Sequence, residues 1–169
     1  LNMLNGIFSF AIYDSIKKSL FIARDQFGVK PLYIYRNNNQ FLFSSELKTF
    51  LNFKIDKELN HDALLNYITF LYSPGELTPF KKVTKVLPGT YLKFNVKNPN
   101  KIAFNKYYKI PFNGVYLENS EEELIDLLDT KLQRAVQRQM LSDVPLGFFL
   151  SGGLDSSLIV AIAKKINPN

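Results

Sequence analysis

The residues best suited to chemistry stand near the C-terminal end of the chain, in the run SGGLDSS at positions 151–157. Gly152 and Gly153 lack a β-carbon, so that successive backbone N–H groups can converge there on one anion. A helix that begins directly after the glycines would add unpaired N–H donors and the positive end of its dipole. The three serines of the run offer further hydroxyl donors. Together these features predict a loop that binds phosphate groups.

Asp155 carries a negative charge into this loop, which is unfavourable beside a phosphate unless a divalent cation lies between the two. The alternative for Asp155 is a helix cap without a metal. No lysine follows the glycines, which excludes the Walker loop GxxxxGK[ST], and a dinucleotide fingerprint is weakened because a third spaced glycine is missing. The alternative for the whole run is a glycine-rich connection whose serines and aspartate only cap a helix.

The flanking residues predict the elements that would position this loop. The apolar run LGFFL at 146–150 is typical of a buried strand, and the segment LIVAIAKKI after the loop has its apolar residues on one helical stripe. Upstream, Ser120 and Glu123 form a capping box for a helix that extends to about Met140. Helix, strand, loop and helix are the first part of a parallel α/β unit. One parallel strand cannot stand alone, so we expect this second domain to be incomplete.

The first two thirds of the chain predict a sheet-rich domain. A meander of four strands is expected at 7–13, 20–24, 32–36 and 40–44, with a tight asparagine hairpin at 37–39. A short helix over 46–51 is followed by a helix over 62–70 that Asn60 caps. Residues 76–88 are expected to be irregular, and further strands are expected at 89–96 and 101–110, with a turn at 98–100. The linker-like segment 111–120 places the domain boundary between residues 112 and 113.

Composition narrows the class of protein. The net charge of +6 comes from lysines that are scattered singly or in pairs, which favours solvated surface over a nucleic-acid interface. No apolar run approaches the length of a membrane span, and the first residues do not form a convincing signal peptide. The absence of cysteine is compatible with the cytoplasm, and it excludes a thiol nucleophile within these 169 residues.

In their order along the chain, five stretches resemble the glutamine-hydrolysing asparagine synthases. These are LNGIFSFAIYD, LFIARDQFGVKPLYIY, FLFSSELKTF, SPGELTPFKKVTKVLPGTYL and QMLSDVPLGFFLSGGLDSS. The resemblance implies an α+β chain. Residues 1–112 would be the C-terminal part of an α-β-β-α sandwich, the N-terminal-nucleophile glutaminase domain, and residues 113–169 the start of a parallel α/β nucleotide-binding domain. In such an enzyme the glutaminase releases ammonia from glutamine, while the second domain uses ATP and Mg²⁺ to adenylate aspartate. Ammonia then displaces AMP, which gives asparagine, glutamate, AMP and pyrophosphate.

The resemblance also assigns the site residues. The ATP-binding residues would be Leu150, Ser151, Gly152, Gly153, Leu154, Asp155, Ser156 and Ser157. Asp155 would be the residue that contacts Mg²⁺ and pyrophosphate. No catalytic residue is assigned, because the family's N-terminal Cys and its glutamine-binding residues lie upstream of the part that corresponds to Leu1. We therefore expect an internal fragment that has neither glutaminase nor synthetase activity by itself.

Other charged residues are interpreted as structural. The loop RDQFGVKP at 24–31 gathers charges and a glycine but corresponds to glutaminase scaffold in the family. Glu46 is expected to be buried or at the domain interface rather than to act as an acid or base. His61, the only histidine, is expected on the surface near a helix start.

The expected partners are glutamine, aspartate and ATP, without nucleic acid or membrane, in the cytoplasm, and a homodimer is compatible with the sequence. One alternative is a β-lactam-synthetase-like enzyme, which lacks the Cys and closes a ring instead of using ammonia. A second alternative is a related amidotransferase that adenylates another carboxylate, in a peptide or a sugar acid. A non-catalytic basic binding module is the alternative outside the enzymes.

Overall fold

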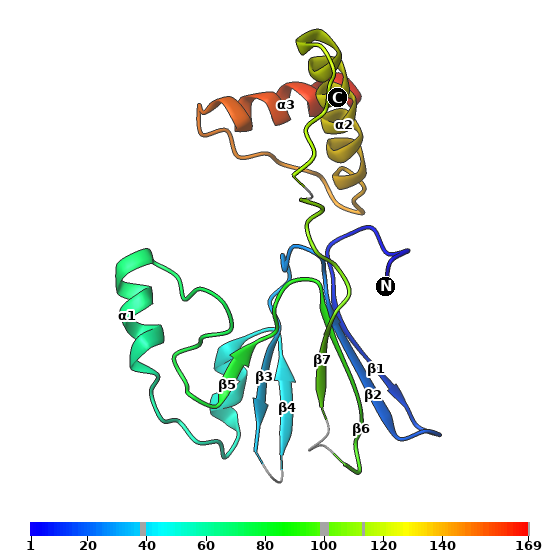
Figure 1. Cartoon of the computed structure of the whole chain (residues 1–169). Coiled ribbons are helices and arrows are strands. Elements are labelled where there is room, and N and C mark those ends of the chain that lie inside the picture. The colour runs from blue at the N-terminus through cyan, green and yellow to red at the C-terminus, as the bar shows by residue number, and fades with distance from the viewer. Residues whose placement is uncertain (38–39, 99–101, 113, 169) are drawn as a thin grey trace. The chain divides into compact units, whose positions relative to one another are not determined.

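The structure is a computed structural model that describes residues 1–37, 40–98, 102–112 and 114–168. The chain divides into two compact units, Leu1–Pro111 and Phe112–Asn169, which we call unit 1 and unit 2 (Figure 1). The elements of unit 1 are β1 (Ser9–Asp14), β2 (Ser19–Arg24), β3 (Tyr33–Arg36), β4 (Phe41–Ser44), η1 (Leu47–Asn52), α1 (His61–Phe70), β5 (Val83–Lys85), β6 (Thr90–Asn95) and β7 (Ala103–Lys106). Unit 2 contains α2 (Glu121–Gln139) and α3 (Leu154–Ile166). This mixture of helix and sheet confirms the α+β class.

The strands of unit 1 form two antiparallel sheets (Figure 1). The four-stranded sheet has the order β1-β2-β6-β7, and the three-stranded sheet has the order β4-β3-β5. The predicted meander over 7–44 is therefore wrong: β2 pairs with β6 and β3 pairs with β5, so the loop after β2 carries the chain from one sheet to the other. The physical reason is burial, because each sheet has an apolar face that needs a partner layer.

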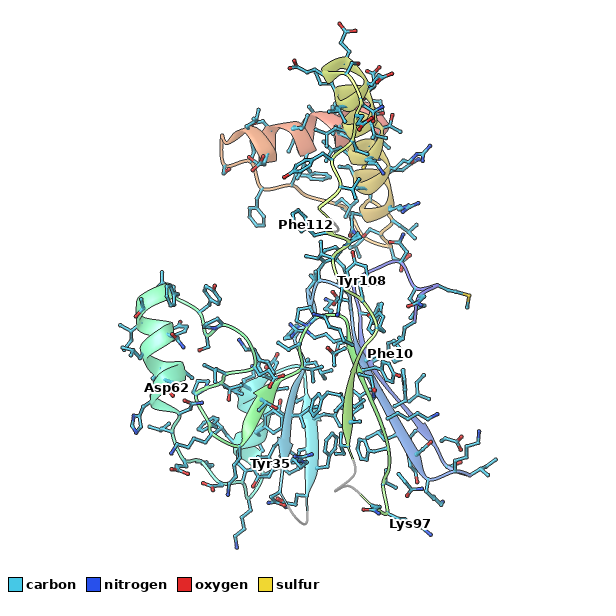
Figure 2. The ribbon with its side chains drawn as sticks, viewed as in Figure 1. Phe10, Tyr35, Asp62, Lys97, Tyr108 and Phe112 are labelled. Atoms are coloured by element: carbon cyan, nitrogen blue, oxygen red, sulfur yellow. The ribbon has the colours of Figure 1, made fainter. Side chains whose placement is uncertain are left out.

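The core of unit 1 lies between the sheets and on the outer side of the three-stranded sheet. One apolar cluster joins both sheets: Ile22, Leu32, Ile34, Val86 and Leu92. A second cluster, of Tyr35, Phe50 and Val83, packs η1 against the three-stranded sheet, and Figure 2 labels Tyr35. Ile34 is 3% exposed and Tyr35 is 1% exposed, although successive strand residues point to opposite faces. The three-stranded sheet is thus covered on both sides.

The outer face of the four-stranded sheet carries a row of aromatic rings. The ring centroids of Phe8 and Phe10 lie 5.4 Å apart, and those of Phe10 and Phe21 lie 6.1 Å apart. Phe21 stacks on Tyr91 of β6 at 5.3 Å (Figure 2 labels Phe10). Such cross-strand aromatic contacts stabilise a sheet, and between these rings Ala23 is fully buried.

Several local predictions hold and others need correction. Asn60 caps α1 as expected, because its side chain accepts a hydrogen bond from the backbone N–H of Ala63 at 3.2 Å. The short helix expected over 46–51 is the 3₁₀ helix η1. The segment 76–88 is not wholly irregular, since β5 forms there by pairing with β3. The asparagine hairpin and the turn at 98–100 include residues 38, 39, 99 and 100, which lie outside the described residues, so both turns stay predictions.

Unit 2 is built on the packing of α2 against α3, through Val136, Ile162 and Ala163. The buried strand predicted over 146–150 is wrong: these residues have no regular structure, and Phe149 is fully exposed. A parallel strand needs a neighbour to accept its backbone hydrogen bonds, and the described part of unit 2 contains no strand. Among the described residues, no helix combines the length and the apolar character that a membrane span requires.

The capping box of α2 is confirmed and carries a prediction. The hydroxyl of Ser120 accepts from the Glu123 N–H at 3.3 Å, and the Glu123 carboxylate accepts from the Ser120 N–H at 3.0 Å. The hydrogen bonds that the carboxylate accepts, first from the Ser120 backbone N–H and then from the Asn119 side chain at 3.2 Å, lower the pKa of Glu123. We expect Ser120→Ala to reduce the helix signal of unit 2 in circular dichroism, because a cap of this kind contributes about 1 kcal/mol. Ser142→Ala, which removes a serine outside both helices, is the control.

The same capping box predicts a dependence on pH. Folding lowers the pKa of Glu123. The stabilisation of α2 by the ionised carboxylate is therefore fully present above the pKa of Glu123 in the unfolded chain, and it is lost as the pH falls through the lower pKa of the folded chain. When the pH is lowered, the helix signal in circular dichroism should therefore decrease more for the unaltered chain than for the Glu123→Gln variant. Identical acid titrations of the two proteins would contradict this prediction.

Candidate phosphate-binding loop

The SGGLDSS run forms a turn that leads directly into α3. Gly153 is the N-cap residue in an extended conformation, with φ −77° and ψ 161°, and the helix begins at Leu154. Gly152 has φ +81°, in the left-handed region that residues with a β-carbon rarely adopt. The backbone thus requires a glycine at 152, which is the conformational role that the sequence predicted for it.

The first amides of α3 have no acceptor in the part of the chain that the structure describes. The Ser157 N–H is the first to make a helical bond, to the Gly153 carbonyl at 3.1 Å. The N–H groups of Leu154, Asp155 and Ser156 precede it and remain available. Three unpaired amides at the positive end of a helix are suited to an anion such as phosphate.

Two of the three serines bind each other across the loop. The Oγ atoms of Ser151 and Ser156 lie 2.9 Å apart. The Ser156 hydroxyl also lies 3.1 Å from the Gly153 carbonyl oxygen as a donor, and the Gly153 N–H donates to Ser151 Oγ at 3.4 Å. These contacts hold the turn against the first turn of α3. They also place two hydroxyl groups beside the unpaired amides.

The remaining predicted site residues are also at this end of α3. Leu150 is 62% exposed and Leu154 is 84% exposed, so both have surface to offer a ligand. Asp155 lies in the first turn of the helix, where a negative side chain is favoured. Among the described residues, no group of three His, Asp or Glu side chains could hold a metal ion. One carboxylate nevertheless fits Mg²⁺ when phosphates and waters complete the coordination.

The loop at 24–31 has a structural explanation. Asp25 is 1% exposed, and its carboxylate accepts from the N–H groups of Phe27 at 3.1 Å and of Val29 and Lys30 at 3.0 Å. The Arg24 guanidinium donates to the carbonyls of Lys30 at 2.7 Å and Gly28 at 2.6 Å, and to that of Val86. Every hydrogen bond described for these two side chains joins them to this loop or, through Val86, to the chain before β6.

Two other sequence predictions are settled by exposure. Glu46 is not buried: its side chain is exposed and forms an ion pair with Lys48 at 2.8 Å, so that part of the prediction is wrong. A residue at the N-cap position of a short surface helix has little reason to be buried. His61 is exposed at the first position of α1, as expected.

Sequence reasoning missed a cavity of about 290 Å³ in unit 1. Arg36 of β3 and Glu76, from the segment before β5, both line it. No local pattern could have indicated that these two residues line one cavity, because forty residues separate them in sequence and it is the pairing of β3 with β5 that brings their segments together.

Known proteins match the chain over nearly its whole length. The glutamine amidotransferase domain family matches residues 1–108, and the asparagine synthase family matches residues 127–169. Asparagine synthetase [glutamine-hydrolyzing] 1 of Bacillus subtilis is 39% identical over 166 residues, which are 98% of this chain and 26% of that protein. Putative asparagine synthetase [glutamine-hydrolyzing] 2 of Methanocaldococcus jannaschii is 38% identical over 95% of this chain and 31% of its own length. Amidase chyE of Penicillium rubens is 33% identical, over 98% and 24% respectively. The chain therefore spans between about a quarter and a third of the length of these relatives.

Proposed function

The chain belongs to the glutamine amidotransferase domain family, and on this premise we propose that it is a segment of a glutamine-hydrolysing asparagine synthase. The whole enzyme would take glutamine, aspartate and ATP, and would give asparagine, glutamate, AMP and pyrophosphate. The observation that carries the proposal is the loop before α3, with Gly152 at φ +81° and three unpaired amides beyond it. This loop lies within the residues that match the asparagine synthase family.

The proposal includes the two-domain division. Residues 1–112 would be the C-terminal part of a glutaminase sandwich of the N-terminal-nucleophile type, and two sheets that share one apolar cluster support this. Residues 113–169 would begin the ATP-binding domain, which is supported by the family match at 127–169. The separate compactness of Leu1–Pro111 is consistent with a boundary near residue 112.

In unit 2 the chain's own residues would hold and orient the polyphosphate. The amides of Leu154, Asp155 and Ser156 would donate to phosphate oxygens, while Gly152 keeps the turn open to their approach. Ser151 and Ser156 would exchange their mutual hydrogen bond for bonds to the same oxygens. Fixed donors of this kind stabilise the negative charge that develops on a departing pyrophosphate. The side chains of Leu150 and Leu154 would shield the nucleotide from water.

Asp155 would contact Mg²⁺, which supplies positive charge between the carboxylate and the phosphates. Activation of aspartate by ATP is chemically necessary, since a carboxylate is a poor electrophile until one of its oxygens becomes part of a good leaving group. The nucleophile that releases ammonia is not among these residues, because the chain contains no cysteine. We place the enzyme in the cytoplasm, where ATP is available, and as a homodimer.

The relatives differ in the reactions for which they are named. The relative from Penicillium rubens is named an amidase, although its identity to this chain is only six percentage points below that of the Bacillus relative (39% against 33%). A related amidotransferase or β-lactam-synthetase-like enzyme that adenylates another carboxylate is therefore the second candidate. The loop before α3 would have the same role in both.

Nucleotide titration tests the role of the loop directly. We expect ATP with Mg²⁺ to shift the amide signals of residues 151–157 in nuclear magnetic resonance spectra, whereas AMP, which lacks the β- and γ-phosphates, shifts them much less. Ammonia release from glutamine, measured in the same samples, should stay at background. Equal shifts from AMP and ATP would contradict polyphosphate binding, and glutamine hydrolysis would contradict the assignment of the nucleophile to another segment.

A further inference from the structure

A second site of a different character lies in unit 1. Its cavity of about 290 Å³ has an apolar part made by Ile34 of β3, Phe41 of β4 and Phe104 of β7, together with Ile102. Ile34 belongs to the cluster that joins the two sheets, so this part of the cavity reaches the space between them. The volume corresponds to about ten water molecules, which suits a free amino acid with an aliphatic side chain.

Four charged side chains line the same cavity, and two of them are neutralised. Lys81 Nζ lies 2.5 Å from a carboxylate oxygen of Glu58, and Lys82 Nζ lies 2.6 Å from one of Asp56. Both carboxylates come from the chain between η1 and α1. The two lysines therefore already have counter-ions.

The other two charges, Arg36 and Glu76, are opposite in sign, and no described residue forms an ion pair with either of them. Within the described residues, neither side chain has an ion pair within 4.0 Å, with the other or with a third group. Arg36 stands directly opposite Phe41 in the pairing of β3 with β4. The backbone carbonyl of Glu76 accepts from the N–H of Lys85 on β5, at 2.9 Å, which ties its segment to the sheet. The backbone thus holds one positive and one negative group at the border of one partly apolar cavity.

We propose that this cavity binds a zwitterionic α-amino acid with an apolar side chain. The guanidinium of Arg36 would take the α-carboxylate, since arginine matches carboxylate geometry with two parallel donors. The carboxylate of Glu76 would take the α-ammonium group. The side chain would lie against Ile34, Phe41 and Phe104, where apolar contact favours binding. This site does not use the loop before α3 and is independent of the proposal made for it.

Calorimetric titration of the 169-residue chain with L-leucine tests the proposal. We expect L-leucine to bind saturably. The affinity for 4-methylpentanoate, which lacks the ammonium group, should be at least tenfold lower. The same loss is expected for 3-methylbutylamine, which lacks the carboxylate, and for glycine, which lacks the side chain. Arg36→Gln and Glu76→Gln should each lower the affinity for L-leucine at least tenfold. Arg138→Gln and Glu118→Gln make the same replacements outside the cavity and should leave binding unchanged.

Each other outcome overturns the proposal. If 4-methylpentanoate bound as tightly as L-leucine, Glu76 would have no part in recognition. If the unaltered chain, with an intact circular dichroism spectrum, gave no saturable heat with L-leucine at millimolar concentration, there would be no such site. Loss of binding in the Arg138 or Glu118 variants would show that the effect does not arise in this cavity.

Discussion

Replacing Asp25 by alanine is expected to lower the free energy of unfolding of unit 1 by about 3–4 kcal/mol. The carboxylate is almost fully buried and accepts from three backbone N–H groups, those of Phe27, Val29 and Lys30. Alanine removes the charged acceptor that these three donors share, and a hydrogen bond to a charged group contributes about 1.5–3 kcal/mol. Urea unfolding followed by circular dichroism measures the change.

Asp62→Ala is the matched control for this experiment, because Asp62 is exposed in the first turn of α1 (Figure 2). Its effect should remain within about 0.5 kcal/mol, as for most exposed positions. If the Asp25 and Asp62 variants unfolded at the same urea concentration, the loop at 24–31 would not have the structural role that its hydrogen bonds indicate.

Asp25 also predicts how stability depends on pH. Burial by itself would raise the pKa of the carboxyl, but the hydrogen bonds from the N–H groups of Lys30, Val29 and Phe27 outweigh burial and hold the pKa below its usual value. The stabilisation is therefore complete above the unfolded pKa of about 3.9 and is lost as the pH falls through the lower folded value. Below about pH 4 the unaltered chain should lose stability more steeply than Asp25→Ala.

Replacing Gly152 by alanine is expected to weaken the binding of ATP with Mg²⁺ by about five- to thirty-fold. The reason is conformational, since a residue with a β-carbon at φ +81° costs about 1–2 kcal/mol. Steric overlap is not the cause, because a β-carbon placed at Gly152 has no atom within 4 Å. The loop would relax to negative φ and turn its amides away from the phosphates. Titration with a fluorescent ATP analogue gives the two affinities.

Gly147→Ala is the control for Gly152→Ala. Gly147 lies in the same connection between α2 and α3, is also exposed, has no atom within 4 Å of an added β-carbon, and does not have a positive φ. The Gly147→Ala variant should bind ATP with Mg²⁺ with the same affinity as the unaltered chain. Equal affinity in the Gly152 and Gly147 variants would show that the left-handed turn at 152 is not needed for binding.

Local sequence patterns determined the features that depend on neighbouring residues. The capping residues Ser120 and Asn60 predict helix starts correctly because each side chain accepts from an amide only three residues away. The start of α3 directly after Gly153 follows in the same way from the glycines and the polar residues after them. The order of residue types around 151–157 also predicts phosphate binding, which stays a prediction until nucleotide is titrated.

The tertiary structure alone decided which distant segments meet. The separation of β1–β4 into two sheets, and the formation of β5, depend on strands far along the chain whose apolar faces compete for the same core. The apolar run at 146–150 has strand-like composition but no strand neighbour, so composition misled there. Arg36 and Glu76 face one cavity only because β3 pairs with β5. Short-range hydrogen bonds are encoded within a few residues, whereas sheet pairing and cavities result from burial summed over the whole domain.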